Sequence, residues 1–197
     1  MKIKIKSNER VYICGQTGSG KSVLFKTIIL PQIQNYVIYD YKEEINIEGA
    51  EIFTAPEDFL TKKNRPAIIY RPKTGQDEEF DMLCKQVVYR GNNVLVLDEM
   101  ANHVTATKIL PYHDMILRLG RSRGVGNINI TQRPRYTHNN IISQTEHFFV
   151  FYLNQLTDRR KMAEILGEDV LQKIPKYYFW YYTPEMDKPV LCKPVKI

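Results

Sequence analysis

The chain has 197 residues, of which 43% are hydrophobic and 25% are charged, and lysine plus arginine exceed the acidic residues by 28 − 22 = +6. This composition excludes disordered, collagen-like and fibrous proteins and predicts a single globular domain over residues 1–197. The longest apolar runs, such as Phe148–Leu153, are far shorter than the ~18–20 residues of a membrane span. We therefore expect a protein that is not integral to a membrane.

Short β-rich runs alternate with helical stretches, which predicts an α/β fold with a mostly parallel central sheet flanked by helices. Pro31 should fray or bend the last turn of the first helix. In chain order, the first half predicts an edge strand at Lys2–Lys6, a strand at Arg10–Cys14, a helix from Ser19 to about Gln34, strands at Tyr36–Asp40 and Ala67–Tyr70, and a helix at Asp77–Tyr89.

The second half continues this alternation and ends in aromatic and apolar runs. It predicts a buried strand at Val94–Leu97, a helix at Tyr112–Leu119, strands at Ile128–Thr131 and Phe148–Leu153, a helix at Asp158–Leu166, and closing strands at Tyr177–Tyr182 and Val190–Val195. The core then covers about residues 10–166, and a C-terminal β extension covers about 175–197. The aromatic side chains of 177–182 could stack bases, but a strand packed on the core is favoured.

The strongest motif follows the strand at Arg10–Cys14 and matches G-x-x-x-x-G-K-[ST]. Glycines allow successive backbone N–H groups to point at phosphate oxygens, and the helix that begins there adds its positive dipole end. Lys21 can reach the β- and γ-phosphates, and Ser22 can bind Mg²⁺. The predicted nucleotide-binding residues are Gly15, Gln16, Thr17, Gly18, Ser19, Gly20, Lys21 and Ser22.

A second motif ends the apolar run Val94–Leu97 with Asp98 and Glu99. A buried strand that ends in an acid places a carboxylate at the edge of the sheet where α/β proteins bind ligands. Asp98 would hold Mg²⁺ together with Ser22, and Glu99 would polarise a water for attack on the γ-phosphate. These residues predict an ATP- and Mg²⁺-dependent hydrolase.

The strand at Ile128–Thr131 runs directly into Gln132, Arg133 and Pro134. A polar amide at this strand end can lie near the γ-phosphate and the attacking water, so Gln132 is a candidate sensor. The stretch Met115–Thr145 contains no acid, and five arginines fall within it. They are Arg118, Arg121, Arg123, Arg133 and Arg135. Arginine suits phosphate, whether of ATP in a neighbouring subunit or of nucleic acid.

Taken in order, these motifs and the segment Gly120–Gly124 resemble the FtsK–HerA superfamily of DNA-pumping ATPases. The compact length is similar to that of genome-packaging ATPases of membrane-containing icosahedral viruses. The resemblance covers about Arg10 to Leu166 and implies a RecA-like, additional-strand P-loop NTPase core. It also implies a homo-oligomeric, commonly hexameric ring that translocates double-stranded DNA, with Gln132 as the sensor glutamine.

The resemblance further implies an arginine that acts on the nucleotide of a neighbouring subunit. Arg121 is the best match, Arg71 is a second candidate, and the sequence leaves both open. Arg133 and Arg135 follow the sensor and are candidate DNA contacts. The implied partners are double-stranded DNA and viral capsid or membrane-vertex proteins. The implied location is the host cytoplasm or a packaging vertex of the virion.

Two other functions remain open at the level of the sequence. A HerA-like helicase or plasmid-transfer ATPase shares the chemistry but usually carries additional segments. A small P-loop kinase would suit this length, but kinases need no water-activating group such as Glu99, and the chain has no evident lid segment. Hydrolysis of ATP without a phosphoryl acceptor, stimulated by DNA, would separate the motor from the kinase.

Overall fold

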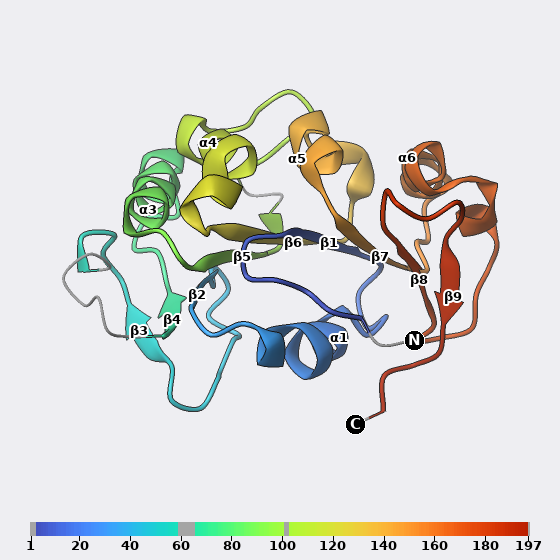
Figure 1. The fold of residues 1–197 in the computed structure, drawn as a ribbon, viewed down its shortest axis with the longest axis horizontal. Helices are drawn as coiled ribbons and strands as arrows, with labels where there is room; N and C mark the ends of the chain where they lie inside the picture. Colours follow the sequence, from blue (N-terminus) through green and yellow to red (C-terminus); the bar gives the residue numbers. More distant parts are fainter. Residues whose placement is uncertain (1–2, 59–65, 101–102, 197) are drawn as a thin grey trace.

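The computed structural model describes residues 3–58, 66–100 and 103–196. These residues form one nine-stranded sheet in the order β3-β4-β2-β5-β6-β1-β7-β8-β9, with helices on both of its faces (Figure 1). The strands are β1 (Arg10–Cys14), β2 (Tyr36–Tyr39), β3 (Glu51–Phe53), β4 (Ala67–Tyr70), β5 (Val94–Asp98), β6 (Gly126–Thr131), β7 (His147–Phe151), β8 (Phe179–Tyr182) and β9 (Val190–Cys192).

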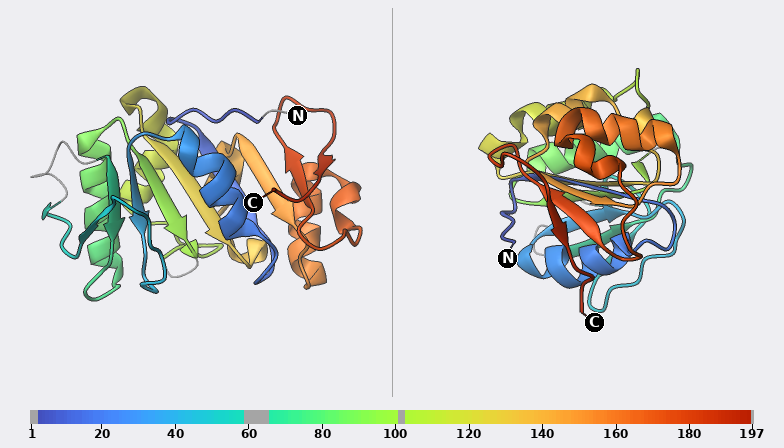
Figure 2. Two further views of the ribbon diagram at one scale, coloured as in Figure 1. Left: turned by 90° about the horizontal axis from the view of Figure 1, so that it is seen from below. Right: turned by 90° about the vertical axis from the view of Figure 1, so that its right-hand side faces the viewer.

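The sheet is parallel from β3 to β7, and β8 and β9 continue it as an antiparallel pair. This confirms the predicted mostly parallel sheet with a C-terminal β extension. The extension lengthens the central sheet at the β7 side and leaves β9 at its edge (Figure 2). No helix among the described residues is long and apolar enough to cross a lipid bilayer.

Helices cover both faces of the sheet, as parallel strands require. One face carries α3 (Asp77–Arg90), α4 (Pro111–Leu119), α5 (Asn139–Gln144) and α6 (Leu156–Leu166), and the other carries α1 (Lys21–Leu24) (Figure 1). Short 3₁₀ segments are η2 (Leu30–Gln32), η4 (Gly120–Arg123), η5 (Pro134–Tyr136) and η6 (Glu168–Leu171).

The central strands are buried on both faces, and most of them have nearly continuous apolar sequences, whereas β6 carries Asn127 and Asn129 in its buried middle. Along β1, Tyr12 and Cys14 join the core under α3 to α6, whereas Val11 and Ile13 join the core under α1. This alternation follows from the two-residue period of a strand. The sheet therefore separates two apolar cores.

Several predicted elements differ from the observed ones. Lys2 lies outside the described residues, and Ile3–Lys6 is not a strand, because its backbone binds side chains instead of a neighbouring strand. The N–H of Ile5 donates to Gln32 Oε1 at 3.1 Å, and that of Lys6 donates to Glu9 Oε2 at 2.8 Å. Residues 51–53 form β3 and residues 139–144 form α5. The sequence pattern predicts neither of these two elements.

The first helix is shorter than predicted and changes its winding. It begins at Lys21, continues as a π-helix over η1 (Phe25–Ile29) and closes as the 3₁₀ turn η2, which contains Pro31. Gly20 has a φ of +109°, outside the helical region, so the helix cannot begin earlier. A helix interrupted by π and 3₁₀ turns replaces the continuous one that the sequence predicts.

The position of β6 matters most for function. β6 lies between β1 and β5 and pairs in parallel with both, with Cys14 opposite Thr131 and Asp98 opposite Ile130. The carboxyl ends of these three strands therefore meet at one edge of the sheet, called here the carboxyl edge. The motifs that follow them are brought together there, as an additional-strand P-loop core requires.

Candidate nucleotide-binding site

The loop after β1 is tethered to the strands on both sides of it. The N–H of Gly15 donates to Thr131 O at 3.3 Å, and the N–H of Gln16 donates to Tyr152 O at 3.1 Å. A Cβ at position 15 would lie 2.5 Å from the Cβ of Phe151, so only glycine fits where the chain leaves β1. The loop and the helix N-terminus together would form a cradle for phosphate.

Lys21 lies beneath this loop, and its ammonium is held by main-chain carbonyls. Nζ donates to Gly15 O at 2.8 Å and to Gln16 O at 3.0 Å. Burial lowers the pKa of Lys21, and the nearby carboxylates of Glu99 and Asp98 oppose this effect. Among the described residues, Ser19 Oγ is buried without a hydrogen-bond partner. A phosphate oxygen would satisfy both groups, so the loop fits a triphosphate.

Asp98 and Glu99 lie where β5 ends. Burial raises the pKa of Asp98, Glu99 raises it further, and Lys42 and Lys21 counteract the rise. Because a divalent cation would offset this unfavourable burial of charge, the carboxylate fits Mg²⁺ together with the exposed hydroxyl of Ser22. Oxygen ligands of this kind are the ones that Mg²⁺ prefers.

Glu99 adopts a backbone conformation that glutamate rarely takes. Its φ is +69°, in the left-handed region. Its N–H donates to Ile130 O at 3.1 Å, and its Oε1 accepts a hydrogen bond from Thr131 Oγ1 at 3.3 Å. The chain therefore turns sharply after Asp98, which directs the Glu99 carboxylate toward the end of β6. Strained backbone of this kind is concentrated at functional sites.

Gln132 contacts the phosphate-binding loop itself. Its Oε1 accepts a hydrogen bond from Thr17 Oγ1 at 2.6 Å, across 115 residues of sequence. Together with the contact between Thr131 and Glu99, this bond links the loop after β1, the end of β5 and the end of β6. The structure thus brings together three motifs that the sequence analysis identified separately.

The segment after Gln132 is held by a residue that the sequence analysis assigned only to a helix. Asp158, at the first turn of α6, is 1% exposed. Its carboxylate accepts two hydrogen bonds, one from Arg133 Nε at 3.0 Å and one from the backbone N–H of Arg135 at 3.0 Å. The Arg135 guanidinium lies 4.8 Å from the ring centre of exposed Tyr136. Arg133 is thus partly engaged inside the chain, whereas the Arg135 side chain is exposed.

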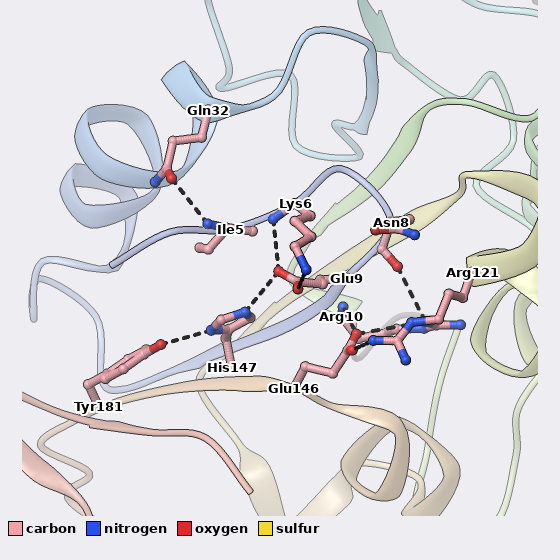
Figure 3. Close-up of polar contacts among 10 residues, drawn as sticks. All are labelled: Ile5, Lys6, Asn8, Glu9, Arg10, Gln32, Arg121, Glu146, His147 and Tyr181. Atoms are coloured by element: carbon pink, nitrogen blue, oxygen red, sulfur yellow. Dashed lines mark hydrogen bonds and ion pairs between the residues drawn. The ribbon is translucent and has the colours of Figure 1, made fainter. Parts of the chain in front are cut away.

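The two candidate trans-acting arginines lie in different surroundings. Arg71 follows β4, where its Nε pairs with the buried Asp40 at 3.2 Å and its Nη2 donates to Ile45 O at 3.2 Å; its side chain is 18% exposed. Arg121 lies in η4, pairs with Glu146 and is 63% exposed (Figure 3).

Arg121 and Gln132 belong to opposite ends of the same strand. η4 leads into β6, whose six residues span roughly 20 Å, and Gln132 follows that strand. Arg121 therefore lies at the edge where the parallel strands begin, called here the amino edge. There, Glu146 Oε2 also accepts a hydrogen bond from the backbone N–H of Arg10 at 3.0 Å (Figure 3). Arg121 cannot reach the phosphate-binding loop of its own chain.

Known proteins share this fold. The structure of the genome packaging NTPase B204 from Sulfolobus turreted icosahedral virus 2 in complex with ATP-gammaS has a TM-score of 0.84 and 22% identity, covering 98% of this chain and 100% of that chain. The cytoplasmic domain of the type VII secretion ATPase EccC from Thermomonospora curvata has a TM-score of 0.67 and 14% identity, covering 98% of this chain and 25% of that chain.

A relative is also found by sequence. Protein P9 of Pseudoalteromonas phage PM2 is 25% identical over 187 residues, which is 90% of this chain and 86% of P9. No family model matches the sequence. The resemblance inferred from the motifs is confirmed in the fold, which is the P-loop NTPase fold of the viral packaging protein.

Proposed function

We propose that this chain is an ATPase that couples ATP hydrolysis to translocation of double-stranded DNA, in the packaging of a viral genome. The observation that carries the proposal is the link from Thr17 through Gln132 and Thr131 to Glu99. It joins the loop that would hold the phosphates to the residue that would activate water. Support also comes from similarity to a packaging NTPase whose structure holds an ATP analogue.

Each site residue has a distinct role in hydrolysis. Lys21 and the loop N–H groups would neutralise the β- and γ-phosphates, and Ser22 and Asp98 would hold Mg²⁺, which supplies further charge neutralisation when bound. Glu99 would accept a proton from the attacking water. Gln132 would exchange its bond with Thr17 for one to the γ-phosphate or the water, so this bond would report whether ATP is present.

We propose a homo-oligomeric, hexameric ring in which catalysis would be completed between neighbouring subunits. Arg121 is exposed at the amino edge and is the favoured residue to reach a neighbour's γ-phosphate. An arginine supplied in trans can accelerate phosphoryl transfer ~10³–10⁵-fold. The proposed partners beyond DNA are capsid or membrane-vertex proteins of the virion, and the proposed location is the host cytoplasm or a packaging vertex.

DNA would be held through its phosphates by Arg133 and Arg135. A motor that moves a whole genome gains nothing from base contacts that would stop it at preferred sequences, whereas backbone contacts are indifferent to sequence. Because Arg133 directly follows Gln132, loss of the γ-phosphate would move the DNA-contacting segment with no intervening structure. Arg135 is the more direct contact, since its guanidinium is exposed and pairs with no acid among the described residues.

The decisive experiment measures ATP hydrolysis without any phosphoryl acceptor, with and without duplex DNA of several unrelated sequences, at two salt concentrations. We expect stimulation by every duplex. DNA affinity should fall with salt at a log–log slope of roughly −0.9 per phosphate contacted. Strong preference for one sequence, or no stimulation by any DNA, would contradict the packaging motor. Phosphate transfer to a small acceptor would favour the kinase instead.

A further inference from the structure

Glu146 pairs with Arg121 at the amino edge, and its own position is fixed by Arg10. It lies directly before β7, beside the first residue of β1. Its Oε2 accepts a hydrogen bond from the N–H of Arg10 at 3.0 Å (Figure 3). The N–H of Glu146 donates in return to Arg10 O at 3.0 Å. Both the main chain and one carboxylate oxygen of Glu146 are therefore committed to Arg10.

The other carboxylate oxygen faces Arg121. Glu146 Oε1 pairs with Arg121 Nη2 and has no further partner within residues 3–58, 66–100 and 103–196. The Glu146 side chain is 26% exposed, which is much less than that of Arg121. A free arginine side chain samples many rotamers, and ordering it costs conformational entropy. A carboxylate that is anchored through one oxygen restricts this sampling through the other.

Arg10 also holds the helix that precedes Arg121. Its guanidinium is 5% exposed, and Nη2 donates to Leu117 O at 2.7 Å. Leu117 belongs to α4, which runs directly into η4. Burial lowers the pKa of Arg10, and the carboxylate of Glu146, 3.7 Å from Nη1, opposes this effect. Glu146 is thus shared between a buried arginine that fixes it and an exposed arginine that it can orient.

The backbone of the η4 turn is held independently of Glu146. The N–H of Val125 donates to Gly120 O at 2.8 Å, and the N–H of Asn92 donates to Arg123 O at 3.0 Å. A Cβ at position 120 would lie 2.6 Å from Val125 O, so the turn packs tightly against the residue before β6. The freedom left to Arg121 is therefore mainly that of its side chain, which Glu146 restricts.

We propose that Glu146 is a positioning residue for Arg121, which it keeps oriented at the amino edge until the γ-phosphate of a neighbouring subunit's ATP replaces the carboxylate. The inference rests on the proposed function, because it assumes that Arg121 acts on a neighbour's nucleotide. The exchange is favourable because an exposed ion pair is weak, whereas a phosphate offers the guanidinium a bidentate partner. Glu146 itself contacts no reacting atom.

Glu146→Gln tests this role, because glutamine keeps the shape of the side chain and loses its charge. Its one oxygen can still accept from the N–H of Arg10, and its NH₂ group then faces Arg121, donor against donor. We expect turnover at saturating ATP to fall ~10–10²-fold, as for a displaced catalytic group. ATP affinity should stay within about twofold, because the loop of the same chain lies at the opposite edge. Steady-state phosphate release and equilibrium ATP binding measure the two quantities.

Mixing subunits distinguishes positioning of Arg121 from damage to the variant's own site. With Lys21→Ala subunits, an intact loop of Glu146→Gln can face a neighbour whose Glu146 and Arg121 are both intact, so turnover should exceed the weighted mean of the two variants. With Arg121→Ala subunits, no interface regains an intact pair, so turnover should equal the weighted mean. A merely structural defect would not produce this difference.

Glu9→Gln is the matched control. Glu9 lies at the same edge with a side chain that is 12% exposed, and it pairs with Lys6 and His147 instead of Arg121 (Figure 3). It should keep turnover within about twofold. Glu146→Asp covers the case in which Glu146→Gln does not fold, since it keeps the charge beside Arg10 and shortens the reach to Arg121. It should lower turnover at least about threefold with unchanged ATP affinity.

Three outcomes would overturn the positioning role. They are turnover in Glu146→Gln equal to or above that of the wild type, no gain on mixing with Lys21→Ala, or an equal loss in Glu9→Gln. The double variant Arg121→Ala with Glu146→Gln should turn over as slowly as Arg121→Ala alone, because both changes remove one function. A further loss in the double variant would show that Glu146 acts through another group.

Failure of the proposed function would look different. If the wild type does not hydrolyse ATP, or if Arg121→Ala keeps wild-type turnover, the action of Arg121 on a neighbour fails and the positioning role fails with it. If mixing restores Arg121→Ala but Glu146→Gln turns over like the wild type, the action between subunits stands. Glu146 then serves only the buried Arg10.

Discussion

The carboxyl edge and the amino edge of the sheet hold their cations in opposite ways. At the carboxyl edge, Lys21 is bound to loop carbonyls and Arg133 to the nearly fully buried Asp158. At the amino edge, Arg121 is 63% exposed, and its partner Glu146 also accepts from Arg10. Lys21 and Arg133 are thus engaged within the chain, whereas the side chain of Arg121 is largely exposed. In the proposed ring, each edge would supply half of a site between subunits.

Among the arginine substitutions, removing Arg121 should give the largest effect on turnover. In Arg121→Ala we expect hydrolysis to fall ~10³-fold or more, because the charge that stabilises a neighbour's transition state is lost. Mixing it with Lys21→Ala subunits should restore part of the activity, since some interfaces then combine an intact loop with an intact arginine. Steady-state phosphate release against mixing ratio measures this.

Arg123→Ala serves as the control for Arg121→Ala, because Arg123 is exposed in the same η4 turn. It should retain turnover within twofold. If Arg71→Ala abolishes hydrolysis and Arg121→Ala does not, the trans-acting residue is Arg71. The amino edge then contributes nothing to a site between subunits. Activity of a dilute monomer would contradict the ring as well.

At the carboxyl edge, Glu99→Gln should reduce turnover ~10²–10³-fold and leave ATP affinity within about threefold. Water activation is lost, whereas Asp98 and Lys21 remain to hold the nucleotide and Mg²⁺. Single-turnover hydrolysis and equilibrium binding of ATP measure the two effects separately. Glu164→Gln, at an exposed carboxylate on α6, should be unchanged. Wild-type turnover in Glu99→Gln would remove this residue from the mechanism.

For stability the order of the two edges should be reversed: the substitution at the carboxyl edge should lower Tm more than the one at the amino edge. Arg133→Ala leaves the buried Asp158 without its charged partner, a loss of about 1.5–3 kcal/mol for a hydrogen bond to a charged group. For a chain of this length we expect Tm to fall by about 4–10 °C. Arg121→Ala should shift Tm by less than about 2 °C, because an exposed ion pair contributes little.

A double variant checks the assignment of the Arg133 effect to Asp158. Arg133→Ala combined with Asp158→Asn should cost less than the sum of the single substitutions, because both remove the same interaction. Differential scanning calorimetry gives the four values. Additive losses would show that Arg133 stabilises the fold through other contacts.

The smallest expected change in Tm is a gain of stability at the carboxyl edge. Burial raises the pKa of Asp98 above its usual 3.8, so the ionised carboxylate opposes folding at neutral pH. Asp98→Asn should therefore raise Tm at pH 7 while abolishing Mg²⁺-dependent hydrolysis. The gain should shrink as pH falls and vanish below about 3.8, where the carboxyl is protonated in folded and unfolded chains alike. A loss of Tm at pH 7 would contradict this.

The sequence by itself determined the local chemistry of the carboxyl edge. The loop Gly15–Ser22 was predictable because only a tight, glycine-rich turn before a helix satisfies that spacing. Asp98 and Glu99 were predictable because an apolar run can end only at the edge of a buried sheet. The strands Arg10–Cys14 and Ala67–Tyr70 have the predicted bounds, since their runs are buried on both faces.

The tertiary structure decided which of these residues meet. In the sequence, the acid-free stretch Met115–Thr145 forms one continuous basic segment. In the structure, β6 lies in the middle of this segment, so Arg121 and Arg133 lie at opposite edges of the sheet. Asp158 pairs with Arg133 across 25 residues, and Tyr177 lies beside Gly20 although 157 positions separate them (177 − 20). Sequence patterns report the period of each element and the residues at its ends. These local patterns do not indicate which strands are neighbours. The strand order depends on the packing of the two apolar cores on the whole sheet, which involves residues far apart in the sequence.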